Sequence, residues 1–174
     1  AYTQSMFQSL SITNKSPAQI LENLNDLIGK RLRDGDFITL AVALFDPNEK
    51  SVTITRAGHN WPLYYCSESD SISELRSKGS CIGMMENPEF KNRLEEHKIA
   101  LKKGDFILLY TDGITEAFDN EKKMFDIGNL KSAIKESVHR PGNEIIDHIN
   151  SRVTAFIDSD ERQDDATMIG IKIH

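Results

Sequence analysis

The sequence lacks any apolar run that approaches the roughly 20 residues of a membrane-spanning helix, so we expect no membrane span in this segment. Cysteine is scarce: Cys66 and Cys81 have no zinc-site spacing and are too few for a disulfide framework. Two ordinary thiols suit a reducing compartment, so we expect a cytoplasmic location. Positive charge is also in deficit, with 21 Lys and Arg against 27 Asp and Glu and a net charge of −6. This balance argues against a nucleic acid as the main partner.

The clearest helix signal begins at Ser16. Ser16 can cap the helix, Pro17 suits its first position, and Gln19 can complete a capping box. Apolar residues then recur at helical spacing, which predicts a core-facing stripe: Ile20, Leu21, Leu24, Leu27, Ile28 and Leu32. We expect this helix to end near Asp34-Gly35, because glycine is unfavourable inside a helix.

Two segments are apolar on both of their alternating faces. Residues 37–45 and 106–110 each show this pattern, which predicts short strands that are buried on both faces. Residues 46–49 (Asp-Pro-Asn-Glu) have turn composition, and residues 51–57 alternate between apolar and polar side chains. Residues 37–57 are therefore predicted to form an antiparallel hairpin.

The remaining pattern indicates an α+β fold with an antiparallel sheet, because strands and helices do not alternate regularly. We expect one domain over residues 1–174, with no internal repeat. The other predicted elements are strands over residues 63–66, 72–75, 93–101 and 166–173, and helices over residues 127–138 and 143–157.

Acidic residues flank two of the predicted strands. Asp112 follows the strand over 106–110, and Asp164 and Asp165 precede the strand that begins at Ala166. If these strands pair antiparallel, the carboxylates meet at one sheet edge, where they repel one another unless a cation neutralises them. Oxygen-rich sites suit Mg²⁺ or Mn²⁺. Asp and Gly are also ordinary turn formers, so a purely structural role stays open at this point.

Four segments of the chain carry a family resemblance. The segments, in chain order, are AGHNWP (57–62), LKKGD (101–105), LLYTDGITEA (108–117) and QDDAT (163–167). They resemble the motifs AGHxxP, LxxGD, LLYTDGxxEA and DDxT of SpoIIE/RsbU-type PP2C-like serine/threonine phosphatases. The order and spacing agree from about Phe37 to Ile173, and four motifs in the right order are a specific signal.

The resemblance implies a PP2C-like antiparallel β-sandwich flanked by helices, with two or more Mn²⁺ or Mg²⁺ ions. It makes Asp112 and Asp164 metal ligands, makes Asp165 either a supporting residue or a ligand to an additional ion, and places Gly113 in the cofactor-binding segment. The implied nucleophile is a metal-bound water, so no side chain is expected to act as the nucleophile. The implied substrate is a phosphoserine or phosphothreonine regulatory protein of the anti-sigma-antagonist type.

The sequence departs from the family at one motif. The family has an upstream Gly-Asp segment that opens a glycine-rich turn and supplies a bridging aspartate. Here, Gly35-Asp36 and Gly104-Asp105 are each followed by Phe and aliphatic residues. We therefore expect a partial domain that lacks its N-terminal strands and first metal motif, in a longer protein with an upstream sensory or response-regulator domain.

Two further expectations follow from that departure. Strands missing from a sheet would expose a sheet edge, which makes a homodimer possible. A catalytically incomplete module that docks a phosphoprotein or a regulatory domain is the alternative function. His59 could act as a general acid near a phosphate, but we favour a turn residue that packs against an aromatic ring.

Overall fold

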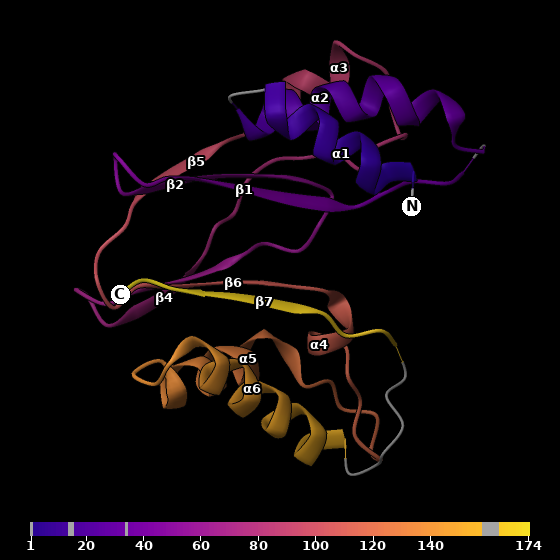
Figure 1. Ribbon diagram of the computed structural model, residues 1–174. Helices are drawn as coiled ribbons and strands as arrows, with labels where there is room; N and C mark the ends of the chain where they lie inside the picture. Colours follow the sequence, from indigo (N-terminus) through magenta and orange to yellow (C-terminus); the bar gives the residue numbers. More distant parts are fainter. Residues whose placement is uncertain (1, 14–15, 34, 158–163) are drawn as a thin grey trace. The chain divides into compact units, whose positions relative to one another are not determined.

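The computed structural model describes residues 2–13, 16–33, 35–157 and 164–174. The chain forms two compact units, which we describe separately (Figure 1). Unit 1 comprises Ala1–Trp61 and Leu75–Leu101, and unit 2 comprises Pro62–Glu74 and Lys102–His174. Among the described residues, no helix has both the length and the apolar character needed to cross a membrane.

Unit 1 contains a three-stranded antiparallel sheet in the order β1-β2-β5, with helices on one face (Figure 1). Buried side chains of α2 pack against Val42, Ala57 and Ile82 on this face. The elements of unit 1 are α1 (Tyr2–Thr13), α2 (Pro17–Ile28), the 3-10 helix η1 (Gly29–Arg31), β1 (Leu40–Asp46), β2 (Ser51–Ala57), α3 (Glu89–Asn92) and β5 (His97–Ala100).

The predicted start of helix α2 is confirmed, and its second cap residue differs from the expectation. The Ser16 hydroxyl accepts a hydrogen bond from the Gln19 N–H (3.4 Å). The second capping side chain is that of Glu96 instead of Gln19. Its carboxylate oxygen Oε1 accepts hydrogen bonds from the Ser16 hydroxyl at 2.6 Å and from the Ala18 N–H at 2.9 Å. The predicted burial of Leu27 was wrong, since its side chain is 41% exposed, whereas Ile20, Leu21, Leu24 and Ile28 are buried as predicted.

Strand β1 forms the predicted hairpin but is not buried on both faces. It pairs antiparallel with β2 in the register Leu40↔Ala57 to Asp46↔Ser51. Val42 is its only fully buried residue, while Leu44 and Phe45 are each 39% exposed. The expectation of burial on both faces was wrong because β1 lies at the edge of its sheet.

Unit 2 contains a four-stranded antiparallel sheet in the order β4-β3-β6-β7, with α5 and α6 on one face (Figure 1). Its elements are β3 (Leu63–Cys66), β4 (Ser71–Glu74), β6 (Phe106–Tyr110), α4 (Asp112–Thr115), α5 (Asp126–Ser137), α6 (Gly142–Ile157) and β7 (Met168–Lys172). The elements predicted in this part of the chain are confirmed, with β7 shorter than expected at both ends.

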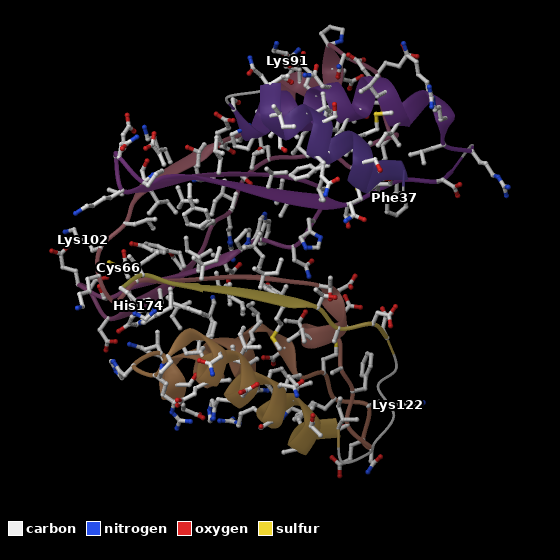
Figure 2. The ribbon with its side chains drawn as sticks, in the orientation of Figure 1. Phe37, Cys66, Lys91, Lys102, Lys122 and His174 are labelled. Carbon is white, nitrogen blue, oxygen red and sulfur yellow. The ribbon has the colours of Figure 1, made fainter. Side chains whose placement is uncertain are left out.

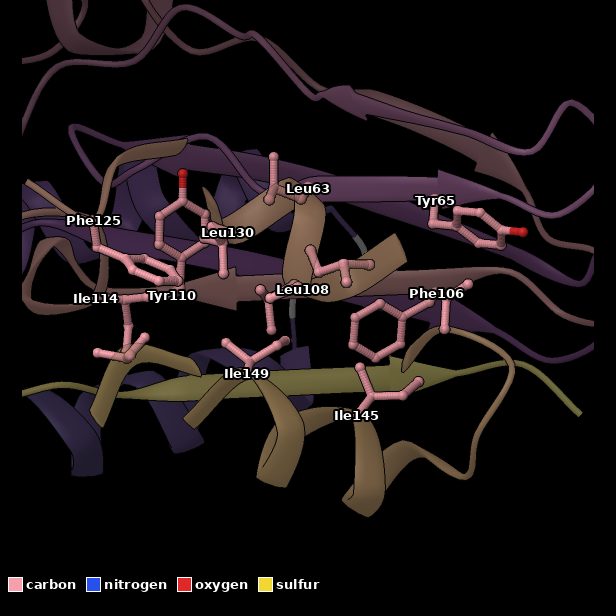
Figure 3. Packing of buried hydrophobic residues seen from close by; sticks show 14 of the residues in the cluster. Leu63, Tyr65, Phe106, Leu108, Tyr110, Ile114, Phe125, Leu130, Ile145 and Ile149 are labelled. Carbon is pink, nitrogen blue, oxygen red and sulfur yellow. The ribbon is translucent and has the colours of Figure 1, made fainter. Parts of the chain in front are cut away.

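The core of unit 2 lies between β3 and β6 and the two long helices. Phe106 and Leu108 of β6 pack with Ile145 and Ile149 of α6, and all four side chains are buried (Figure 3). Each such side chain contributes about 1.5–3 kcal/mol through burial. This packing fixes β6 in its sheet, and the C-terminal end of β6 leads directly to Asp112.

Candidate metal centre

The two acidic segments of unit 2 meet where β6 ends and β7 begins. The strands pair antiparallel with Tyr110 opposite Met168, as the sequence predicts. Beyond the last pair, the Thr111 N–H donates to the Thr167 carbonyl at 3.0 Å. The Thr167 N–H in turn donates to the Thr111 hydroxyl oxygen at 2.9 Å. The residue before Asp112 is thus joined to the DDxT-like segment.

Gly113 brings the two segments into direct backbone contact. A Cβ atom at this position would lie 2.5 Å from the Asp165 carbonyl oxygen, which is closer than real Cβ contacts, and 3.0 Å from the Asp165 carbonyl carbon. The Thr111 hydroxyl also donates to the Asp165 carbonyl at 3.3 Å. The sequence did not single out Thr111, although it lies within the LLYTDG match. Only glycine, which has no Cβ atom, allows the backbone at position 113 to lie this close to the Asp165 carbonyl group.

The carboxylates of Asp112 and Asp164 have similar local hydrogen bonds. Oδ1 of Asp112 accepts from the Gly113 N–H at 3.1 Å, and Oδ1 of Asp164 accepts from the Asp165 N–H at 2.7 Å. The side chains of all three aspartates are exposed. Turn aspartates make the same kind of bond, so these contacts leave the structural reading of both residues open. Gln163, the first residue of the matched QDDAT segment, lies outside the described residues.

The described residues supply only part of the ligand set that a metal ion needs. Across residues 2–13, 16–33, 35–157 and 164–174, no group of three or more His, Cys, Asp and Glu side chains could hold a metal ion. What the structure brings together is the pair of segments that carry Asp112 and Asp164–Asp165. Hard oxygen donors of this kind fit Mg²⁺ or Mn²⁺, which also accept waters and substrate phosphates as ligands. The metal-ligand roles of these residues stay predictions.

The aspartate of the LxxGD-like turn has a different environment. Asp105 is fully buried, and its carboxylate accepts from the Lys102 N–H (2.8 Å), the Tyr64 hydroxyl (2.9 Å), and the N–H and hydroxyl of Ser67 (both 2.9 Å). Burial raises its pKa, but these hydrogen bonds outweigh that effect and lower it below the usual value. Lys102 of this network and Cys66, the residue before Ser67, lie close together in Figure 2. Asp105 therefore holds the turn before β6 in place.

Residues 57–61 of the AGHxxP-like turn lie in unit 1, and the histidine of this turn has structural contacts. His59 Nδ1 lies 3.3 Å from the Thr39 hydroxyl oxygen, and the His59 carbonyl accepts from Nη1 of Arg56 at 2.8 Å. Gly58 has a positive φ of 68°, and a Cβ there would lie 2.1 Å from Sγ of Cys81. These contacts support our preference for His59 as a turn residue rather than a general acid.

Comparison with known proteins identifies the family of this chain. The family model described as Stage II sporulation protein E (SpoIIE) matches residues 1–174, so the chain belongs to the SpoIIE family. The phosphoserine phosphatase RsbU of Bacillus subtilis is 28% identical over 164 residues, which cover 94% of this chain and 47% of RsbU. The chain thus spans about half the length of this relative.

Two solved structures share the fold. The SiaA-PP2C domain of Pseudomonas aeruginosa superposes with a TM-score of 0.80 at 14% identity, covering 99% of this chain and 66% of that one. The PP2C phosphatase domain with a fragment of the regulatory domain of SpoIIE from Bacillus subtilis also gives 0.80, at 18% identity, covering 99% of this chain and 48% of that one. The predicted PP2C-like fold, with its antiparallel sheets and flanking helices, is confirmed.

Proposed function

We propose that this chain is part of a metal-dependent protein serine/threonine phosphatase domain. One observation carries the proposal: the backbone contact of Gly113 with Asp165 holds the TDG and DDxT segments together at the β6–β7 strand ends. The relative named as a phosphoserine phosphatase supports the reaction class. The expected substrate is a phosphoserine or phosphothreonine regulatory protein of the anti-sigma-antagonist type.

Asp112 and Asp164 are the proposed metal ligands, with Asp165 either supporting them or binding an additional ion. Among the solved structures of similar fold, one is of RsbX in complex with magnesium, and one is of a SpoIIE phosphatase domain presoaked with manganese. Bound divalent cations would lower the pKa of a ligated water and neutralise charge on the phosphoryl oxygens. Thr111 and Gly113 both contact the Asp165 carbonyl group. These contacts would hold the segments that carry Asp112 and Asp164 close together.

We further propose that a carboxylate outside this chain completes the site. The 174 residues contain no Gly-Asp pair followed by a glycine-rich turn, and the described residues provide no group of three potential metal-ligating side chains. Residues 1–174 would then belong to a single PP2C-like domain that lies beside a sensory or response-regulator domain in a longer protein. A homodimer and a cytoplasmic location stay predictions, the latter supported by the free thiols of Cys66 and Cys81.

The test compares three forms of the full-length protein. Asp112→Asn should lower Mn²⁺-dependent phosphate release from a phosphoserine peptide by at least about tenfold, because even residues that only support a metal ligand contribute that much. Asp147→Asn is the matched control, since Asp147 is an exposed carboxylate of the same unit on helix α6. Equal activity of wild type and Asp112→Asn would refute the ligand assignment.

A second measurement uses the chain by itself and does not depend on turnover. Paramagnetic Mn²⁺ should broaden the amide resonances of Gly113 and Asp165 at lower concentration than those of α6, and Asp112→Asn should remove this preference. Uniform broadening over unit 2 would contradict a site at the strand ends. We expect weak metal binding and little turnover from the chain alone, because its donor set is partial.

The alternative function is a catalytically incomplete module that docks a phosphoprotein or a regulatory domain. The observation that favours it is the partial donor set among the described residues. The full-length protein separates the two functions. Binding of the phosphoserine peptide with no Mn²⁺-dependent phosphate release would establish the module, and metal-dependent release that Asp112→Asn abolishes would establish the phosphatase.

A further inference from the structure

Strand β1 forms an open edge of the sheet in unit 1. In the order β1-β2-β5, β1 pairs with β2 on one side, and no described strand pairs with its other side (Figure 1). In an antiparallel strand, every second residue directs its backbone N–H and C=O groups away from the neighbouring strand. The outer side of β1 therefore presents a row of backbone donors and acceptors, which is a template for a further strand.

β1 lacks the features by which edge strands usually avoid such pairing. Those features are short length, Lys or Pro residues, and bulges. The strand is seven residues long and contains no Lys, Arg, Pro or Gly. It pairs with β2 in an unbroken register from Leu40 to Asp46, so it has no bulge. Leu44 and Phe45 are each 39% exposed, and the edge is thus long, regular and apolar.

The other sheet edges among the described residues are better protected. β5 has four residues, and the ammonium group of its Lys98 pairs with the Glu49 carboxylate. β4 also has four residues, and β7 has five, which include Gly170 and Lys172. Short strands and lysines are common means of protecting an edge, and glycine weakens a strand. β1 is therefore the edge at which an added strand gains most.

The sequence of β1 is complementary to itself in antiparallel orientation. In an antiparallel pair, opposite residues share one face of the sheet. The register that pairs all seven residues of β1 with a second copy places Ala43 opposite Ala43 of that copy. Phe45 then lies opposite Ala41 of the second copy, and Leu44 lies opposite Val42. Each large exposed side chain thus meets a smaller apolar residue across the two-fold axis.

The charged residue of β1 does not oppose this pairing. Asp46 is the only charged residue of the strand, and its Oδ1 accepts from the Asn48 N–H at 2.9 Å and from the Glu49 N–H at 3.0 Å. This carboxylate is therefore bound within its own turn. In the self-paired register, Asp46 lies opposite Leu40, and the two copies of Asp46 lie about 20 Å apart at opposite ends of the pair.

We propose that β1 is a self-association surface, to which β1 of a second copy of this chain adds in antiparallel orientation about a two-fold axis at Ala43. The sheets of unit 1 in the two copies would then join through β1. Strand addition takes its affinity from main-chain hydrogen bonds and its specificity from alternate side chains. The surface lies wholly in unit 1, so its function does not depend on the metal centre.

The size of this surface predicts a weak and reversible dimer. One strand pair of seven residues buries much less than the total of about 1,600 Å² that is typical of a stable interface. The dimer should therefore form as the protein concentration rises and dissociate on dilution. Each contact occurs twice because of the two-fold axis, so one substitution changes two contacts.

Disulfide trapping tests both the strand and its register. The two Ala43 α-carbons would lie about 4.5–5.5 Å apart, which a disulfide can bridge. Mild oxidation should therefore link Ala43→Cys chains into dimers. Ala41→Cys is the matched control, because the two copies of residue 41 would lie about 13 Å apart. The wild-type chain measures the background from Cys66 and Cys81.

Two outcomes of the trapping experiment would overturn the proposal. One is that Ala43→Cys gives no more linked dimer than the wild-type chain. The other is that Ala41→Cys links as efficiently as Ala43→Cys, which would exclude the proposed register.

A second variant tests the surface without a covalent link. Phe45→Lys should weaken the dimer by at least about tenfold, because a lysine on an edge strand opposes strand pairing. Sedimentation velocity over a range of protein concentrations measures the affinity. Phe37→Lys is the matched control, since Phe37 is a 56% exposed phenylalanine of the same unit that precedes β1. Unchanged affinity in Phe45→Lys, or an equal loss in Phe37→Lys, would refute the assignment.

Amide hydrogen exchange in the wild-type protein keeps the proposal testable if a variant fails to fold. The β1 amides should exchange more slowly at high than at low protein concentration, whereas those of β5 should not change. Exchange of the β1 amides that is independent of concentration would contradict self-association. In the full-length protein, protection of these amides in the monomer would assign the edge to another segment of the same chain and overturn the proposal.

Discussion

The α-carbon of Gly113 lies against the carbonyl group of Asp165, so closely that a Cβ atom would stand 2.5 Å from the oxygen. This contact joins the end of β6 to the residues before β7, and both segments carry the aspartates of the candidate metal centre. A glycine at this position is therefore a requirement of the backbone packing.

The first prediction tests that contact. Gly113→Ala should lower the free energy of unfolding by about 1–3 kcal/mol, because the added methyl group must displace backbone that is already packed. It should also weaken Mn²⁺ binding, measured by the broadening of the Asp165 amide. Gly142→Ala is the matched control, since a Cβ there meets only the Lys172 Cβ at 3.4 Å. Equal stability of the two variants would show that the β6–β7 loops adjust without cost.

The second prediction concerns Asp105, whose buried carboxylate accepts hydrogen bonds from Tyr64, Ser67 and Lys102. Asp105→Asn should cost about 2 kcal/mol or more at pH 7, because the amide group turns one acceptor into a donor that faces other donors. Asp147→Asn, at an exposed position, should cost little. Chemical denaturation monitored by circular dichroism measures both values.

The pH dependence of that difference follows from the lowered pKa of Asp105. The carboxylate stabilises the fold fully above its unfolded-state pKa of about 3.9, and this contribution is lost as the pH falls through the lower pKa of the folded state. The stability gap between wild type and Asp105→Asn should therefore shrink as the pH is lowered below about 4. A gap that is constant from pH 7 to pH 3 would contradict the role of the ionised form.

Local sequence signals were sufficient for much of the fold. The helix start at Ser16 and the bounds of β2 follow from capping and alternation, and both are confirmed. Helix α1 was not predicted, because its apolar residues, including Met6, Phe7 and Leu10, are few and are only partly buried. Exposure at Leu44 and Phe45 also escaped prediction, since it depends on the position of β1 at a sheet edge.

In the candidate site, too, some features could be predicted from the sequence and others could not. The meeting of the segments that carry Asp112 and Asp164 could be predicted, because antiparallel pairing of β6 and β7 brings the two strand ends together. The hydrogen bonds of the Asp105 carboxylate with Tyr64 and Ser67 could not, since Tyr64 lies 41 positions and Ser67 lies 38 positions before Asp105 and only the fold brings them together. Contacts of that kind depend on tertiary structure and leave no periodic trace in the sequence.

The third prediction concerns the start of α2. Ser16→Ala should cost about 1 kcal/mol, the usual value for a lost helix cap. Glu96→Ala should also destabilise the fold, because its carboxylate accepts from the Ser16 hydroxyl and the Ala18 N–H. The double variant should lose less than the sum of the single losses, by about 0.5 kcal/mol or more. Strict additivity would show that the two residues cap the helix independently, and Ser11→Ala, at an exposed serine of α1, serves as the control.

The fourth prediction concerns the reactivity of Cys66. Hydrogen bonds from the Ser69 hydroxyl, and also from the Ser69 and Glu68 N–H groups, lower the pKa of this thiol. The thiolate is the reactive form, so Ser69→Ala should slow alkylation of Cys66 by iodoacetamide at pH 7 severalfold. Mass spectrometry of the labelled peptides separates this thiol from Cys81, whose rate should not change. Ser73→Ala, at an exposed serine of β4, is the control, and the same slowing in that variant would show that Ser69 has no specific effect on the Cys66 thiolate.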